Sequence, residues 1–310
     1  MRTPVSGVKC QVSGGRARIP HSGGWIASRY ELGDLLGEGG TSVVHRAFDH
    51  DLRRWVALKL YALERALPFS PQEVRLQAQV QHPNLMPLYD AGVDAEQYVQ
   101  YLAMPLYPGD DLETILRREG PLPPRRALNC VDQVLSALDF LLYRRGAVHG
   151  DVKPENIWVT RSGATVLMDL NLARALSEEP LGGTPGYTAP EVFDGQLDSR
   201  ADVFSTGCVL YYALCGQPPF RSNDEACFST PPPPSAFGSD LRPELDELCL
   251  IALSKEPEWR FQSPREMQGT VRHPYLLTGA GRRGRLRRGR RGVLATIGRL
   301  AKRCFRAIPW

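Results

Sequence analysis

Short runs of alternating apolar and polar residues come first in the chain, and apolar residues at helical spacing dominate the remainder. The runs YELGDLLGEGG, TSVVHRAFD and RRWVALKLY, beginning at Tyr30, are β-prone and are separated by glycines or charged residues, which predicts an antiparallel sheet. Helical patterning follows in SPQEVRLQAQVQ and in PPRRALNCVDQVLSALDFLLYRRG, where a proline start and a terminal glycine mark the ends. Residues 199–216 and 242–257 also predict helices, with the prolines of 231–234 in a loop. Strands first and helices later predict an α+β chain with two lobes.

The composition is that of a soluble globular protein. With 310 residues, 42% hydrophobic and 23% charged, the chain can bury a core of its own, which excludes fibrous and wholly disordered classes. Its seven cysteines are scattered and form no CxxC pair, so we expect neither a disulfide framework nor a zinc site. The start of the chain lacks an apolar signal-peptide core, and no apolar run is long enough to span a bilayer. These features predict a cytoplasmic protein.

Charge is distributed unevenly along the chain. Eleven of the 38 Lys and Arg residues lie beyond residue 280, whereas no acidic residue follows Glu266. The first 280 residues therefore carry 27 basic and 34 acidic side chains, a net charge of −7, and the last thirty carry +11. The basic end would attract an anion that the body of the protein would repel.

A glycine-rich segment, LGEGGTSVV from Leu36 to Val44, lies between two predicted strands. Glycine there lets backbone N–H groups approach phosphate oxygens without obstruction by a Cβ atom. A plain glycine-rich hairpin explains the segment equally well. A dinucleotide-binding fingerprint explains it less well, because a strand follows and such a fingerprint opens a helix.

Lys59 ends the apolar strand segment VALK, and Glu73 follows on a helical stretch. A single lysine on a strand is usually solvated. A carboxylate at position 73 could instead pair with Lys59 and hold its charge toward phosphates.

The segments VHGDVKPENIWV and VLMDLNLAR provide the strongest chemical signal. Asp151, Lys153, Asn156 and Asp169 are polar residues set between apolar, strand-like runs, as expected of a site that presents acids and an amide to metal and phosphate. The segment GGTPGYTAPEVF, with Thr184 and Glu191, follows. A polar turn after a helix does not account for the whole series in this order.

Together these motifs resemble the eukaryotic-like serine/threonine protein kinases, especially the bacterial branch, from about Tyr30 to Tyr275. The resemblance implies a two-lobed kinase fold within residues 30–276, with an antiparallel sheet and a C helix in residues 30–107 and a mainly helical lobe in 108–276. Residues 1–29 would form a flexible leader and residues 277–310 a basic tail. The implied activity is transfer of the ATP γ-phosphate to Ser or Thr hydroxyls of protein substrates.

The family pattern also implies a set of nucleotide-binding residues. Around the phosphates and the adenine these would be Leu36, Gly37, Glu38, Gly39, Gly40, Val44, Ala57, Met104, Pro105 and Tyr107, with Asp111 near the ribose. Lys59 resembles the lysine on the α- and β-phosphates, and Glu73 resembles its partner on the C helix.

Catalytic and metal-binding roles follow from the same resemblance. Asp151 resembles the catalytic base, Lys153 the lysine that neutralises the γ-phosphate, and Thr184 the residue that marks Ser/Thr selectivity. Asn156 and Asp169 resemble the ligands of Mg²⁺, with Mn²⁺ as an alternative. The pattern further implies an ion pair of Glu191 with Arg260, and an anchor at Asp202.

Three positions depart from the family pattern, and one of them is Ser42, which replaces the third glycine of the loop. Gly150 replaces the arginine that meets a phosphate on the activation segment, so activity without such phosphorylation is expected. Asn171 replaces a glycine whose backbone freedom matters, and asparagine is the residue that reaches positive φ most easily after glycine.

The departures keep alternatives to an active kinase open. One is a pseudokinase that uses the fold to bind nucleotide or to act as a scaffold. Another is a small-molecule phosphotransferase of the aminoglycoside type, which shares the HGD motif but lacks the GTPGYTAPE segment and the lysine after the aspartate.

The basic tail has two interpretations. GRRGRLRRGRRG is a polycation, and VLATIGRLAKRCFRAIPW places apolar residues at helical spacing with basic residues beside them. Such a segment could contact the anionic inner face of a membrane. It could equally stay solvated or fold back on the acidic body. We expect no specific binding to nucleic acid, because aromatic residues do not alternate with the arginines.

Overall fold

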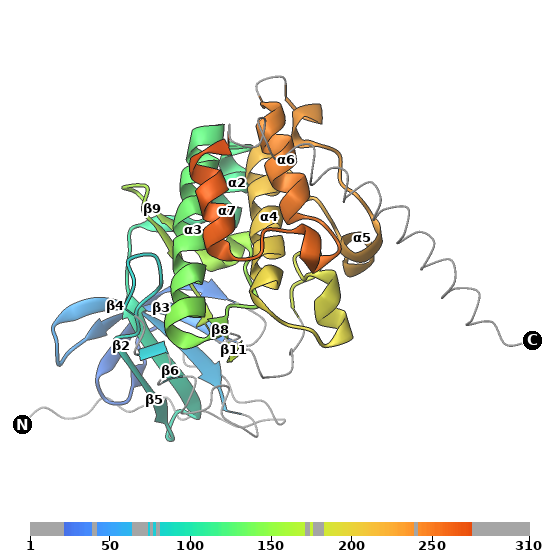
Figure 1. Ribbon diagram of the computed structural model, residues 1–310. Coiled ribbons are helices and arrows are strands. Elements are labelled where there is room, and N and C mark those ends of the chain that lie inside the picture. Colours follow the sequence, from blue (N-terminus) through green and yellow to red (C-terminus); the bar gives the residue numbers. More distant parts are fainter. Residues whose placement is uncertain are drawn as a thin grey trace, which may run out of the picture. The chain divides into compact units, whose positions relative to one another are not determined.

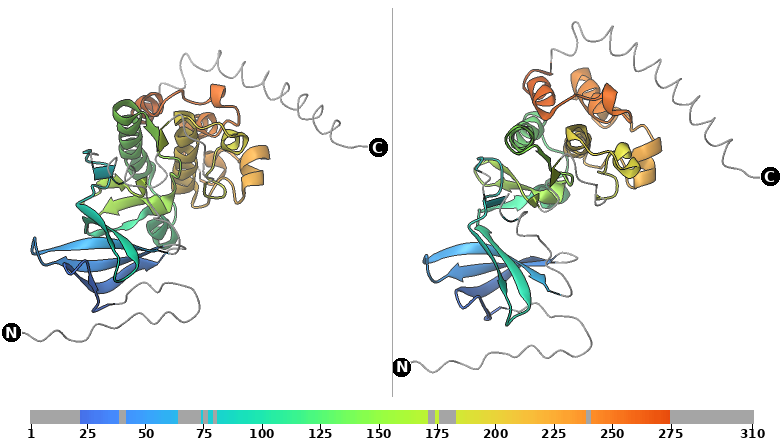
Figure 2. Two further views of the ribbon diagram at one scale, coloured as in Figure 1. Left: turned by 90° about the horizontal axis from the view of Figure 1, so that it is seen from below. Right: turned by 60° about the horizontal axis from the view of Figure 1, so that its bottom comes forward.

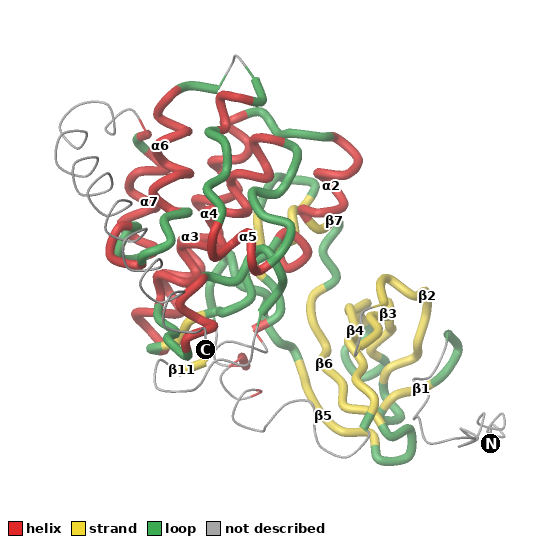
Figure 3. Tube along the Cα trace, turned by 90° about the vertical axis from the view of Figure 1, so that its right-hand side faces the viewer, coloured by secondary structure: helices red, strands yellow, loops and turns green. Residues whose placement is uncertain are grey.

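The computed structural model describes residues 22–38, 42–63, 74, 77–78, 81–170, 174–175, 183–238 and 241–274. The chain divides into two compact units. The first unit comprises Met1–Gly109 with Met168–Asn171, and the second comprises Asp110–Leu167 with Leu172–Trp310. The predicted α+β class is confirmed, since the strands of the large sheet precede most of the helices. Figure 3 shows these strands in yellow and the helices in red.

A six-stranded antiparallel sheet forms the first unit. Its spatial order is β1-β2-β3-β4-β6-β5, and every pair of neighbours is antiparallel. The strands appear in blue to cyan in Figures 1 and 2. They are β1 (Trp25–Ile26), β2 (Tyr30–Glu38), β3 (Ser42–Asp49), β4 (Arg54–Ala62), β5 (Asp90–Asp94) and β6 (Val99–Pro105).

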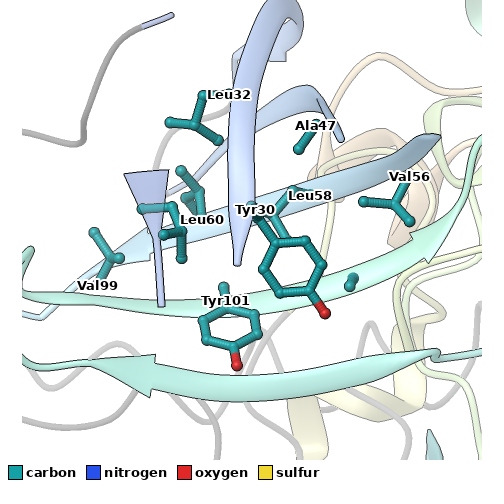
Figure 4. Close-up of a cluster of buried hydrophobic side chains, with 10 residues drawn as sticks. Tyr30, Leu32, Ala47, Val56, Leu58, Leu60, Val99 and Tyr101 are labelled. Carbon is teal, nitrogen blue, oxygen red and sulfur yellow. The ribbon is translucent and has the colours of Figure 1, made fainter. Parts of the chain in front are cut away.

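One face of this sheet carries its main hydrophobic core. In β4 the side chains of Val56, Leu58 and Leu60 are fully buried in a cluster with residues of β1, β2, β3 and β6. The rings of Tyr30 and Tyr101 pack 5.5 Å apart in the same cluster (Figure 4). Because successive side chains of a strand point to opposite faces, the residues between these three, among them Lys59, point away from the core.

Helices make up most of the second unit. The longest, α3, packs against α4 and α7, and α4 also packs against α6 (Figure 1). Nearly every residue of α4 is buried, as expected for a helix that is apolar on all sides. The helices are α2 (Leu112–Glu119), α3 (Pro124–Arg145), α4 (Ser199–Cys215), α5 (Asn223–Phe228), α6 (Pro243–Ala252) and α7 (Pro264–Arg272).

Helix ends follow the signals in the sequence. The prediction of a helix between the prolines at 123–124 and Gly146 is confirmed, since α3 begins at Pro124 and Gly146 adopts a left-handed φ of 58° after its last turn. Asp198 caps α4 by accepting a hydrogen bond from the N–H of Arg200. Within the described residues, no helix is both long and apolar enough to cross a membrane.

Short strands and turns in the second unit position its polar residues. The strands β7 (Gly109–Asp111), β9 (Ile157–Thr160) and β10 (Thr165–Leu167) form a small sheet, and β8 (Ala147–Val148) pairs with β11 (Arg174–Ala175). Four short 3₁₀ turns are also present among the described residues: η1 (Pro154–Asn156), η3 (Pro190–Asp194), η4 (Pro234–Ala236) and η5 (Pro257–Trp259). The segment between β8 and β9 contains the polar motif HGDVKPEN.

Candidate active site

The loop after β8 is anchored to the buried helix α4. The carboxylate of Asp202 accepts hydrogen bonds from the backbone N–H groups of His149, at 2.8 Å, and Gly150, at 2.9 Å. Burial raises the pKa of Asp202, while neighbouring His149 acts in the opposite direction. Gly150 has a φ of 78°, a left-handed conformation that glycine reaches without strain. The loop is therefore positioned by a helix distant in sequence.

Asp151 and Lys153 lie in a hydrogen-bonded network with Thr184. The hydroxyl of Thr184 donates to Asp151 Oδ1 at 2.6 Å, and Lys153 Nζ donates to Thr184 Oγ1 at 2.7 Å. Lys153 Nζ also lies 2.9 Å from Asp151 Oδ2, an ion pair in which the two side chains are 21% and 13% exposed. Carboxylate, ammonium and hydroxyl are thus assembled within the second unit.

Asn156 completes this network. Its amide Nδ2 donates to the backbone oxygen of Asp151 at 2.8 Å and to Oδ2 of the same residue at 3.0 Å. Because both bonds use the amide nitrogen, the amide oxygen is left to accept from another group. Asn156 is the last residue of η1, and Pro154 at the start of that turn is buried.

Lys59 and Asp169 form an ion pair in the first unit. Lys59 Nζ lies 2.7 Å from Oδ1 and 2.8 Å from Oδ2 of Asp169. Burial lowers the pKa of Lys59, but Tyr61 and Asp169 together outweigh it, so the pKa lies above its ordinary value. Asp169 has a φ of 62°, a left-handed conformation that is uncommon in residues other than glycine. The pair therefore places the Lys59 ammonium, bonded to a carboxylate, on the face of β4 opposite the main core.

Other nucleotide-binding residues predicted from the sequence share this face. Val44 is the cross-strand partner of Lys59, and Met104 is the partner of Ala57, so the four side chains lie together on three adjacent strands. A Cβ atom at Gly37 would meet nothing within 4 Å. The packing of the chain therefore does not require glycine there, and the backbone of β2 is open to close approach by a ligand.

The remaining residues of this predicted set lie further along the chain. Leu36 is 49% exposed and Glu38 is the last residue of β2, while Pro105 ends β6 and is buried. Burial raises the pKa of Tyr107, with Tyr89 adding to the shift. Asp111 caps α2 by accepting from the N–H and hydroxyl of Thr114 at 2.8 and 2.7 Å. Asp111 therefore has a structural role as the cap of α2, and the predicted contact with the ribose would be a second role.

Three residues of the predicted site lie outside the described residues. They are Gly39, Gly40 and Glu73. Asn171 and the basic tail lie outside them as well. Among the described residues Lys59 forms an ion pair with Asp169, and its predicted pairing with Glu73 stays a prediction.

The chemistry of Asn156 and Asp169 suits a hard cation. Amide and carboxylate oxygens are the ligands that Mg²⁺ prefers, and Mg²⁺ usually takes only one or two protein ligands in addition to substrate phosphates. Among the described residues, no three His, Cys, Asp or Glu side chains are grouped to hold a metal ion. A dedicated all-protein metal cage is thus not found in this part of the chain, whereas a site shared with phosphates fits the residues present.

A buried ion pair supports the segment that follows Thr184. Arg260 donates to both carboxylate oxygens of Glu191, at 2.6 and 2.7 Å, and its side chain is fully buried. Its other N–H groups donate to three backbone oxygens, so the buried charge is fully hydrogen-bonded. The ion pair expected between these two residues is confirmed.

Comparisons with known proteins agree with this geometry. The model of the protein kinase domain matches residues 30–276. This chain belongs to the protein kinase family. Serine/threonine-protein kinase PknB of Mycolicibacterium smegmatis is 37% identical over 269 residues, and PknB of Mycobacterium tuberculosis is 36% identical over 269 residues. Each match spans 79% of this chain but only 43% of the relative, so the chain covers less than half the length of these curated family members.

A solved structure of the same family is also similar. The kinase domain of Mycobacterium tuberculosis PknI, crystallised as a double mutant, superposes with a TM-score of 0.66 at 26% identity. The superposition covers 82% of this chain and 98% of that domain. The two-lobed kinase fold predicted from the sequence is therefore confirmed.

Sequence reasoning missed several residues that support the site. Tyr61 lies near Lys59, with Nζ 5.3 Å from the ring centroid, and raises its pKa. Ser205, Cys208 and Asn223 hold the backbone of the segment after Thr184. Tyr61 lies in strand β4, and the other three lie in a helix or at a helix start, where such side chains are common, so the sequence alone carries no signal for them.

Proposed function

We propose that this chain is an ATP-dependent protein kinase that phosphorylates Ser and Thr hydroxyls of protein substrates. The observation that carries the proposal is the network in which Asp151 is bonded by Thr184, Lys153 and Asn156. It puts a carboxylate that can take a proton beside a cation that can offset phosphate charge, which phosphoryl transfer requires. The catalytic domain would be residues 30–276, with residues 1–29 as leader and 277–310 as tail.

The proposed cofactors are ATP and Mg²⁺, with Mn²⁺ as an alternative. Lys59 would hold the α- and β-phosphates, and Val44, Ala57 and Met104 would line the adenine. Asn156 and Asp169 would hold the metal through oxygen atoms. When bound, Mg²⁺ would offset the negative charge of the phosphate oxygens.

In the proposed mechanism, Asp151 accepts the proton that the attacking hydroxyl loses. Donors on both carboxylate oxygens, from Thr184 on Oδ1 and Asn156 on Oδ2, orient the group before substrate arrives. Lys153 supplies positive charge beside it, where it stabilises the charge of the transferring phosphoryl group. Asp202 keeps the loop in place through two backbone N–H groups.

Transfer of label from [γ-³²P]ATP to myelin basic protein tests this function. Wild-type protein should label itself or the acceptor in the presence of Mg²⁺. Asp151→Asn should lower the rate by roughly 10²- to 10⁴-fold, because the amide cannot take the proton. Absence of transfer by the wild type, with nucleotide binding intact, would favour the pseudokinase alternative.

We also propose a cytoplasmic location, with the basic tail contacting the anionic inner face of a membrane. Support comes from the eleven basic residues beyond residue 280 and the apolar residues at helical spacing among them. Each basic residue near an anionic surface contributes about 1 kcal/mol. No specific nucleic-acid partner is proposed.

Co-sedimentation with vesicles tests the role of the tail. Full-length protein should pellet with vesicles that contain 30% phosphatidylserine and should stay in solution with neutral vesicles, and a truncation at residue 280 should stay in solution with both. The binding should weaken at high salt, because screening shortens the reach of the charges. Equal pelleting of the two proteins on anionic vesicles would end the membrane proposal.

A further inference from the structure

The backbone of the segment after Thr184 is held by side chains from two helices. The N–H of Gly186 donates to Oδ1 of Asn223 at 3.2 Å, and Asn223 is the first residue of α5. The carbonyl oxygen of Gly186 accepts from the thiol of Cys208 at 3.6 Å, and that of Tyr187 accepts from the hydroxyl of Ser205 at 2.7 Å. Both backbone polar groups of Gly186 are thus bonded to side chains of α4 and α5.

The position of Gly186 is also fixed by close packing. Its φ is 81°, and a Cβ atom would lie 2.6 Å from the backbone oxygen of Phe220. The ring of Phe220 stacks on that of Phe204 in α4, with centroids 5.8 Å apart and planes at 2°. No residue with a side chain fits at 186 without displacement, so the turn rests directly on the core of the second unit.

This turn is continuous with the proposed catalytic network. The carbonyl oxygen of Thr184 accepts from the N–H groups of Tyr187 and Thr188, at 3.1 and 3.2 Å, and from the hydroxyl of Thr188 at 3.0 Å. The hydroxyl of Thr184 meets Asp151 and Lys153. A shift of Gly186 would therefore move Thr184 relative to the carboxylate.

The side chain of Asn223 has no part in capping its own helix. Ser222 is the N-cap of α5, and its Oγ accepts from the N–H of Glu225. The amide oxygen of Asn223 instead leaves the helix to bond Gly186. Ser222 thus caps α5, whereas Asn223 binds the turn. Substitutions of these two neighbouring residues can therefore test the two roles separately.

We propose that Asn223 is a positioning residue for the protein substrate, acting through the backbone of Gly186 on Thr184 and the substrate-binding segment 183–189. This inference rests on the proposed kinase function. It assigns to α5 the task of setting where the acceptor hydroxyl lies relative to Asp151. The nucleotide, which Asn223 does not contact in this proposal, should bind as before.

Steady-state kinetics of three variants tests the proposal. Asn223→Leu should lower kcat/KM for myelin basic protein by roughly 3- to 10-fold, the worth of one hydrogen bond, and leave KM for ATP unchanged. Asn223→Asp keeps an oxygen acceptor and should stay within about 2-fold of wild type. Ser222→Ala, the matched control, should lower the melting temperature but not kcat/KM. Equal kcat/KM losses in Ser222→Ala and Asn223→Leu, or no rescue by Asn223→Asp, would overturn the proposal.

Hydrogen–deuterium exchange separates this inference from the proposed function. The peptide that contains residues 183–189 should exchange at least several-fold faster in Asn223→Leu than in wild type, with no change in Ser222→Ala. An unchanged rate in Asn223→Leu would overturn the inference even if the enzyme transfers phosphate. A wild type that transfers no phosphate would remove the kinase function and, with it, a substrate-positioning role, whatever the exchange rates are.

Discussion

At the scale of single residues, the carboxylate of Asp151 has a donor on each oxygen. Thr184 is the one that also accepts from Lys153, so its hydroxyl links the acid and the cation. A hydroxyl can donate and accept at once, which neither alanine nor valine can imitate. The resemblance to kinases assigned Thr184 to the site. Its two hydrogen bonds, one to Asp151 and one from Lys153, are visible only in the structure.

Thr184→Ala should therefore reduce kcat for phosphate transfer by roughly 10- to 100-fold, since two hydrogen bonds to charged groups are lost. Thr184→Ser keeps the hydroxyl and should retain most of the activity. Initial rates with saturating ATP measure both. Equal losses in the two variants would show that the methyl group and not the hydroxyl matters.

Asp49, the last residue of β3, should contribute to the stability of the protein in a pH-dependent way. Asp49 is almost fully buried, and the hydrogen bond from Arg29, with backbone N–H groups of Leu52 and Asp51, lowers its pKa to about 2. The unfolded-state pKa is about 3.9, so this group stabilises the fold above pH ~4 and loses that contribution as pH falls toward 2. The contribution at neutral pH is roughly 2 to 3 kcal/mol.

Asp49→Asn should accordingly lower the free energy of unfolding at pH 7 and have roughly half that effect near pH 3. Urea denaturation of both proteins at the two pH values measures the difference. Glu31→Gln is a suitable control, because its partner His50 is exposed and the pair should contribute little. A constant difference between Asp49→Asn and wild type across this range would show that the carboxylate charge is not responsible.

At the scale of elements, the long helices could be predicted because their ends carry strong signals. Pro124 and Gly146 mark the two ends of α3, and Ser199–Cys215 matches the predicted helix at 199–216. The helix predicted at 242–257 is shorter in the structure, since α6 ends at Ala252 and Pro257 starts a separate turn. Continuous apolar patterning does not show where a helix stops when no glycine follows.

Gly146, at the end of α3, and Gly186, in the turn after Thr184, are glycines for different reasons. Gly146 has a left-handed φ but open space around its Cα, whereas Gly186 has both a positive φ and the oxygen of Phe220 2.6 Å from where a Cβ would lie. Gly146→Ala should lower the free energy of unfolding by about 1 kcal/mol. Gly186→Ala should cost clearly more and also reduce phosphate transfer. Thermal denaturation with a parallel activity assay distinguishes the two.

At the scale of the whole molecule, the predicted site residues are divided between two units. Lys59 and Asp169 belong to the first unit, and Asp151, Lys153 and Asn156 belong to the second. The sequence could assign these roles because the motifs match a family in order and spacing. The sequence could not reveal the side chains of α4 and α5 that hold the segment after Thr184. Ser205 and Cys208 fit the helical pattern, and their hydrogen bonds go to backbone oxygens of that distant segment.

Binding of ATP and Mg²⁺, as proposed, should stabilise the protein. ATP with Mg²⁺ at about 100 times its dissociation constant adds about 2.7 kcal/mol to a binding-competent protein, a rise in melting temperature of roughly 5 to 10 °C. Asp169→Ala should lose most of this rise, because it removes the proposed metal ligand and the partner of Lys59. A thermal-shift titration with and without Mg²⁺ measures it. An equal rise in Asp169→Ala would exclude a metal role for that carboxylate.

The conformation of Gly150 bears on how such an enzyme could be regulated. Its φ of 78° is free of strain for glycine, and its N–H is bound to Asp202. Gly150→Arg would restore the arginine that meets a phosphate in the family pattern. The substitution would force a bulky residue into a left-handed conformation, with a backbone strain of about 1 to 2 kcal/mol. The N–H groups of His149 and Gly150, bonded to Asp202, hold this part of the loop in place. Glycine at residue 150 thus keeps this loop free of backbone strain, which a phosphate-binding arginine at the same position would introduce.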